Sequence, residues 1–199
     1  SIWPHQAISN RLQFICSVIS IYAYVCERKT YDLCIMTKKM YYSAPLPFVG
    51  QKRMFAKEFK KVLEQFPDGT TFVDLFGGSG LLSHITKSEK PHSKVVYNDF
   101  DGYRLRLEHV SQTNELLSEL RKIVRELPKH KPIVGGARKQ IFECLIKHQD
   151  RYGYLDFITI SSSLLFSMKY CLNIDDMNKE TLYNNIRSTD YPLCDGYLD

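Results

Sequence analysis

One stretch of the sequence limits the possible folds more than any other, a glycine-rich turn between two short apolar runs. Residues 70–76 (TTFVDLF) are β-branched and aromatic, which is typical of a buried strand. Residues 77–80 (GGSG) follow at once, residues 81–87 predict a helix, and residues 94–98 (KVVYN) predict a second strand. Strand, turn, helix and strand form a βαβ unit with parallel strands. The sequence therefore predicts an α/β fold.

An acidic residue lies where such a unit can bind a nucleoside. Asp99 follows the second expected strand, 19 residues after Gly80, and its carboxylate could accept hydrogen bonds from both ribose hydroxyls. Glycines let a ligand approach the backbone, and the free N–H groups of the next helix favour a negative group. The alternative is a turn followed by a helix-capping aspartate with no ligand. The glycine turn, its position between a strand and a helix, and Asp99 together favour a nucleoside cofactor.

The residues of the turn narrow the choice of nucleoside. The GxGxxG pattern is absent, which weakens a nicotinamide or flavin cofactor, and the phosphate-loop pattern GxxxxGK[ST] is absent as well. Asp74 in the first strand suits a cofactor with a positive amino group. S-adenosylmethionine has an ammonium and a sulfonium, so it fits best, and a nicotinamide-dependent oxidoreductase is the alternative.

The rest of the chain predicts mainly helices. We expect helices over 54–66, 101–127, 141–149 and 157–170, a loop over 129–138 and a polar, irregular tail over 173–199. The apolar run 12–26 is too short to cross a bilayer. We interpret residues 1–35 as upstream sequence, the alternative being a hairpin or helix packed on the core. The expected organisation is then 1–35, a cofactor-binding part over 36–112 and a helical part over 113–199.

Positive charge is concentrated in one segment. Seven of the 27 basic residues and one of the 22 acidic residues lie between Arg121 and Lys139, so the remainder is nearly neutral although the chain carries +5. A basic stretch on a balanced domain is typical of a phosphate-backbone partner, and a solvated helix face is the alternative. The six cysteines have no metal or disulfide spacing. We therefore expect free thiols in a cytoplasmic protein, with no metal and no membrane partner.

Three segments together resemble the DNA adenine methylase (Dam-type) family: residues 47–52 (PFVGQK), 73–80 (VDLFGGSG) and 98–101 (NDFD). Their order and spacing also resemble the family's, well over 43–107 and loosely over 114–199. The resemblance implies a Rossmann-like, S-adenosylmethionine-dependent methyltransferase fold with an incomplete parallel sheet and a mainly helical DNA-recognition insertion. It implies methyl transfer to the N6 amino group of adenine in double-stranded DNA.

The resemblance also implies roles for individual residues. Lys52 would hold the methionine carboxylate, Asp74 would face the amino group, Phe48 would pack against the cofactor and Asp99 would bind the ribose, while Gln51 departs from the family's second glycine. The implied cofactor site comprises Phe48, Gly50, Lys52, Asp74, Phe76, Gly77, Gly78, Ser79, Gly80 and Asp99. The implied DNA contacts are Lys131, Arg138 and Lys139 to phosphates, and Arg151, Tyr152 and Tyr154 near bases. Each of these is alternatively an ordinary surface or core residue.

The family's catalytic motif, Asp/Asn/Ser-Pro-Pro-Tyr/Phe, does not occur, because the sequence contains no Pro-Pro pair. In the family this motif accepts hydrogen bonds from the amino group of a flipped-out adenine and stacks on its ring. We interpret the chain as truncated before the motif, and expect that by itself it methylates no DNA. The alternatives are a non-catalytic remnant that binds cofactor or DNA, and a methyltransferase acting on RNA or protein.

Overall fold

The described residues form two compact units. The computed structural model describes residues 41–50, 52–194 and 196–198. The sheet unit contains residues 41–44, Gly50–Tyr103 and 196–198, and the helical unit contains Pro45–Val49 and 104–194. The segment 1–35, which we interpreted as upstream sequence, and Gln51 lie outside the described residues. The division into a cofactor part and a DNA part stays a prediction.

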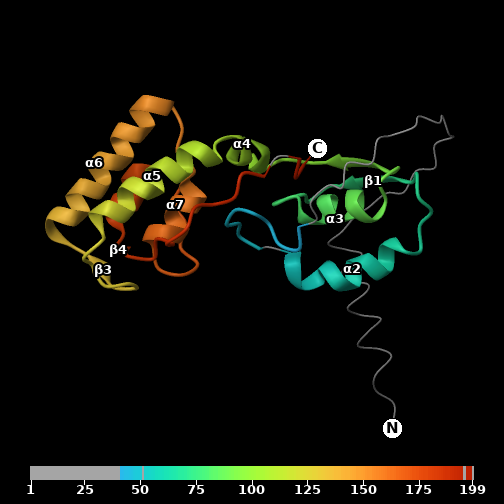
Figure 1. The fold of residues 1–199 in the computed structure, drawn as a ribbon, viewed down its shortest axis with the longest axis horizontal. Coiled ribbons are helices and arrows are strands. Elements are labelled where there is room, and N and C mark those ends of the chain that lie inside the picture. Colours follow the sequence, from blue (N-terminus) through green and yellow to red (C-terminus); the bar gives the residue numbers. More distant parts are fainter. Residues whose placement is uncertain (1–40, 51, 195, 199) are drawn as a thin grey trace, which may run out of the picture. The chain divides into compact units, whose positions relative to one another are not determined.

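The sheet unit is built around two parallel strands, β1 (Thr71–Asp74) and β2 (Lys94–Tyr97). Thr71 pairs with Lys94 and Asp74 pairs with Tyr97, so the two strands end at the same edge. The helix α3 (Leu81–Glu89) connects them, after the short helices η1 (Lys52–Phe55) and α2 (Ala56–Leu63) (Figure 1). The parallel βαβ arrangement predicted from the sequence is confirmed.

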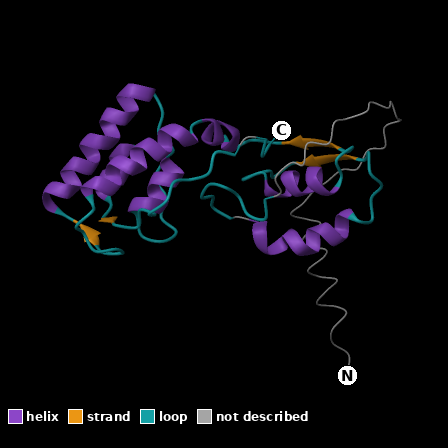
Figure 2. Ribbon diagram, viewed as in Figure 1, coloured by secondary structure: helices purple, strands orange, loops and turns teal. Residues whose placement is uncertain are grey.

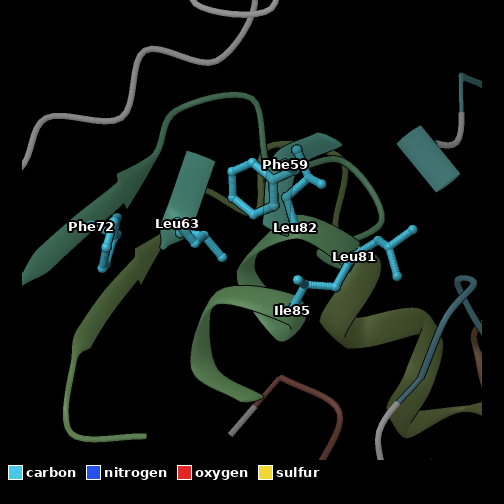
Figure 3. Packing of buried hydrophobic residues seen from close by; sticks show 6 residues of the cluster. All are labelled: Phe59, Leu63, Phe72, Leu81, Leu82 and Ile85. Atoms are coloured by element: carbon cyan, nitrogen blue, oxygen red, sulfur yellow. The ribbon is translucent and has the colours of Figure 1, made fainter. Parts of the chain in front are cut away.

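One apolar cluster fixes α2 and α3 against β1. Phe59 and Leu63 of α2 meet Phe72 of β1, and three residues of α3 complete the cluster (Figure 3). Those three residues are Leu81, Leu82 and Ile85. Each of the six side chains is at most 2% exposed, and burying one such side chain stabilises a fold by about 1.5–3 kcal/mol. Two of them open α3, so the cluster also holds the start of this helix beside the glycine turn.

The helical unit contains most of the remaining elements. These are α4 (Tyr103–Glu108), which begins at the last residue of the sheet unit, α5 (Val110–Ile123), α6 (Gly135–Tyr152), α7 (Phe157–Leu164) and α8 (Ile174–Lys179). Two short strands, β3 (Pro132–Ile133) and β4 (Leu182–Tyr183), pair antiparallel (Figure 2). Among the described residues, no helix has the length and apolar character needed to span a membrane.

Several expected boundaries of helices and loops are wrong, because they depend on contacts that the local sequence does not indicate. The helix expected over 101–127 is interrupted at His109, whose backbone leaves the helical conformation between α4 and α5. The expected loop over 129–138 contains β3 and the start of α6, and the expected irregular tail contains α8 and β4. The helix expected over 157–170 ends at Leu164. Strand β3 depends on pairing with β4, which lies 50 residues further along the chain.

A buried ion pair stabilises the helical unit. Arg106 of α4 donates from Nε to Asp156 Oδ1 at 2.9 Å, and its Nη2 donates to the Pro47 carbonyl at 2.8 Å. Asp156 also caps α7 by accepting the Thr159 N–H at 3.0 Å. The Arg106 and Asp156 side chains are 6% and 1% exposed, so each charge depends on the other. This pair therefore joins the 45–49 segment, α4 and α7.

The substitution Asp156→Ala should lower the free energy of unfolding by about 3–5 kcal/mol, because it leaves the Arg106 guanidinium buried without its carboxylate. Urea unfolding followed by circular dichroism measures this loss. The control Glu143→Ala removes an exposed ion pair to Lys139 with a 3.7 Å separation and should cost less than about 1 kcal/mol. Equal losses of stability in the two variants would contradict the stabilising role of the buried Arg106–Asp156 ion pair.

Candidate functional site

The glycine turn passes directly over the end of β2. A Cβ on Gly77 would lie 2.1 Å from the Tyr97 ring and 2.7 Å from the Asn98 carbonyl, so no larger residue fits without moving the backbone. Gly80 has a left-handed φ of 69°, which favours glycine, and its N–H donates to the Gly77 carbonyl at 2.8 Å. The turn is therefore tight, and α3 begins immediately after it.

Tyr97 joins the glycine turn to Asp99, a role that we did not predict from the sequence. Its hydroxyl lies 2.6 Å from the Gly78 carbonyl and 3.0 Å from Asp99 Oδ1. Burial, with the neighbouring Asp99 carboxylate, raises the pKa of Tyr97 well above its usual value, so the hydroxyl keeps its proton and acts as a donor. A tyrosine two residues before the acidic residue was the available signal.

The two carboxylates implied by the family resemblance lie at the carboxyl ends of β1 and β2. Asp74 is 6% exposed, and its Oδ2 accepts a hydrogen bond from Ser83 Oγ at 2.8 Å. Asp99 follows β2, and its Oδ1 accepts the Tyr103 N–H at 2.6 Å. Both carboxylates are thus oriented by the start of a helix, α3 for Asp74 and α4 for Asp99.

Lys52 reaches this edge of the sheet from a different part of the chain. Gly50 adopts a φ of 75° in a turn before η1, and Lys52 Nζ then donates to the carbonyl of Phe76, the residue before the glycine turn. The structure thus brings together Lys52, Asp74, Phe76, the 77–80 turn and Asp99. Phe48 belongs to the helical unit, and its expected packing against a cofactor stays a prediction.

The last described residues pack against the same turn. Tyr197 is 1% exposed and stacks on His84 of α3 with ring centroids 4.8 Å apart. Leu198 would lie 2.3 Å from a Cβ on Gly80, so its side chain also lies close to the turn. We expected an irregular tail here, because nothing in the local sequence indicates that it returns to α3.

The residues predicted to contact DNA divide into two kinds. Arg138 donates to the Glu180 carbonyl at 3.0 Å and the Asn178 carbonyl at 2.7 Å, so it fastens α6 to α8. Arg151 and Tyr152 both bond the Glu115 carboxylate, at 2.8 and 2.6 Å, which fastens α6 to α5.

Lys131 and Lys139 are exposed, and the Lys139 side chain is 81% accessible. DNA contacts by these five residues and by Tyr154 stay predictions. Among the described residues, no group of three or more His, Cys, Asp or Glu is placed to hold a metal ion.

A glycine turn, a carboxylate after the second strand and a lysine lie at one edge of a parallel sheet. Many α/β proteins bind a nucleoside at an edge of this kind. Residues 48–133 match the family model for D12 class N6 adenine-specific DNA methyltransferase, which confirms the resemblance over this part of the chain. The chain is also similar to a protein of Haemophilus influenzae named "Putative methyltransferase", with 43% identity over 168 residues. That alignment covers 81% of this chain and 55% of the relative, so the chain spans about half the relative's length. No solved structure matches.

The substitution Gly77→Ala should lower the free energy of unfolding by about 1–3 kcal/mol, because the added methyl group overlaps Tyr97 and the β2 backbone. Urea denaturation provides the measurement. Gly136→Ala is the matched control, because Gly136 lies in α6 with nothing within 4 Å of its Cβ position, and alanine there should be neutral or slightly stabilising. An unchanged free energy of unfolding in Gly77→Ala would show that the turn does not need to pack closely against Tyr97.

Proposed function

We propose that this chain binds S-adenosylmethionine at the carboxyl edge of β1 and β2, as part of an enzyme that methylates the N6 amino group of adenine in double-stranded DNA. The observation that carries the proposal is the convergence of Lys52 on the glycine turn between Asp74 and Asp99. Lys52 comes from outside the βαβ unit, yet its ammonium group bonds the Phe76 carbonyl at the turn. A structural turn alone does not require a cation at this position.

The residues at this edge fit the charges of the cofactor. The start of α3 has no side-chain cap, so its N–H groups and the Lys52 ammonium can take the methionine carboxylate. The buried Asp74 carboxylate complements the amino group, and Asp99 is the acceptor for the ribose hydroxyls. The glycine backbone at 77–80 carries few side-chain atoms, so the methionine part of the cofactor can approach it closely.

S-adenosylmethionine supplies an electrophilic methyl group on its sulfonium. Adenine N6 is a poor nucleophile, because its lone pair is delocalised into the ring, and the family activates it with groups from the Pro-Pro motif. The sequence has no Pro-Pro pair, so we propose that these 199 residues bind cofactor and DNA without transferring the methyl group. Labelled methyl groups should then remain on the cofactor when duplex DNA is added, and label in adenine would overturn this part of the proposal.

The helical unit supplies the DNA contacts in this proposal. The exposed Lys131 and Lys139 belong to the basic segment 121–139, whose positive charge attracts a phosphate backbone. Arg138, Arg151 and Tyr152 act differently, because their hydrogen bonds to other helices hold the surface that carries those lysines. Phosphate contacts by the lysines would set the affinity for DNA and the position of the protein on it. Base contacts from other residues would set the recognised sequence.

The substitution Lys52→Met should weaken binding of S-adenosylmethionine by about 10- to 100-fold, the value of a hydrogen bond to a charged group. Isothermal titration calorimetry of the protein with the cofactor measures this change. Lys57→Met on the exposed face of α2 is the control and should bind normally. The proposal fails if the two variants bind equally well, or if the protein prefers a nicotinamide dinucleotide.

A further inference from the structure

A cavity of about 410 Å³ lies in the helical unit, and most of its lining lies beyond the residues that match the family. Three aromatic rings line it, those of Phe166, Tyr170 and Tyr183. Polar side chains complete the lining, including His130 and Asn185. The cavity therefore combines flat apolar surfaces with hydrogen-bonding groups.

The polar wall of this cavity is held in place by the end of α7. Asn185 donates from Nδ2 to the Leu165 carbonyl at 2.8 Å, and from its backbone N–H to the Ser163 carbonyl at 3.1 Å. Its Oδ1 lies 3.0 Å from His130 Nδ1, so the amide orients the imidazole ring. The wall is thus organised before any ligand binds, which lowers the entropic cost of binding.

The rim of the cavity is apolar and exposed. Phe166 is 62% exposed, although the centroid of its ring lies 5.8 Å from that of the Tyr183 ring. Met168 is 81% exposed. Met168 has a φ of 69° and His130 a φ of 59°, the two non-glycine residues with positive φ in the part of the chain that the structure describes. Both line this cavity. Exposed apolar side chains on a strained loop beside a preformed wall are typical of a binding surface.

We propose that this cavity binds a nucleobase of DNA that has left the base stack. Phe166 and Tyr183 would stack on the base, and His130 with Asn185 would bond its polar edge. An aliphatic ligand would use the rings but not the remaining hydrogen-bonding capacity of His130 and Asn185. His130 also lies beside the exposed Lys131 in the basic segment, which can hold the adjoining phosphate. The base is a recognition contact, separate from any adenine that is methylated.

This inference rests on the proposed function, because it takes DNA as the partner. It is tested with a duplex that carries one unpaired 2-aminopurine nucleotide, compared with the fully paired duplex. The unpaired base removes the cost of flipping, so the protein should bind it more tightly and quench its fluorescence. Phe166→Ala should weaken binding to the unpaired-base duplex by about 5- to 100-fold, the value of one aromatic stack.

Leu193→Ala is the matched control, because Leu193 is 63% exposed in the same unit and does not line the cavity. This variant should bind both duplexes like the parent protein. The salt dependence of binding should be the same in all three proteins, since the phosphate contacts are intact, and a misfolded variant would lose it. Circular dichroism melting confirms that Phe166→Ala is folded.

The possible failures can be told apart. If Phe166→Ala binds the unpaired-base duplex as well as the parent does, the cavity does not bind a base, while the DNA-binding part of the proposed function stands. If the parent protein does not quench the 2-aminopurine fluorescence, the cavity likewise does not bind a base. If the parent binds S-adenosylmethionine but neither duplex, both the cavity proposal and the DNA part of the proposed function are overturned.

Discussion

The packing of the Gly77 backbone against the Tyr97 ring is the contact on which the candidate site depends. It lets the turn after β1 lie over the end of β2, so the Tyr97 hydroxyl meets the Gly78 carbonyl at 2.6 Å. The same hydroxyl lies 3.0 Å from Asp99, which ties the acidic residue to the turn. The apolar cluster of α2, β1 and α3 holds the helix that follows. The proposed nucleoside site at this edge therefore depends on close packing between the turn and the end of β2.

The sequence predicted the sheet unit well because its determinants are local. Residues 70–98 carry strand, turn, helix and strand in order, and β1 and β2 pair as that order requires. The role of Tyr97 was missed, because its position two residues before Asp99 was only a weak signal and its contacts depend on the turn folding back over the ring. Strand β3 and the return of Tyr197 to α3 were missed for the same reason, since both depend on residues far apart in the sequence. The individual cofactor roles came from the family resemblance.

The helical unit shows why a count of basic residues does not identify a DNA surface. Arg106 is buried with Asp156, and Arg121 bonds Asp190 and the Ser188 carbonyl. Arg138 bonds two carbonyls near the end of α8. These guanidinium groups hold elements together, because their planar donors can satisfy several acceptors at once. In the segment 121–139, the exposed Lys131 and Lys139 carry positive charge that is accessible to solvent.

Amide chemical-shift mapping with S-adenosylhomocysteine, the product form of the cofactor, tests the central claim most directly. Addition of this ligand to ¹⁵N-labelled protein should shift the amides of Gly78, Gly80 and Asp99 together, with one dissociation constant. Shifts absent from these residues, or confined to the helical unit, would contradict a methyl-donor site at the carboxyl edge of β1 and β2.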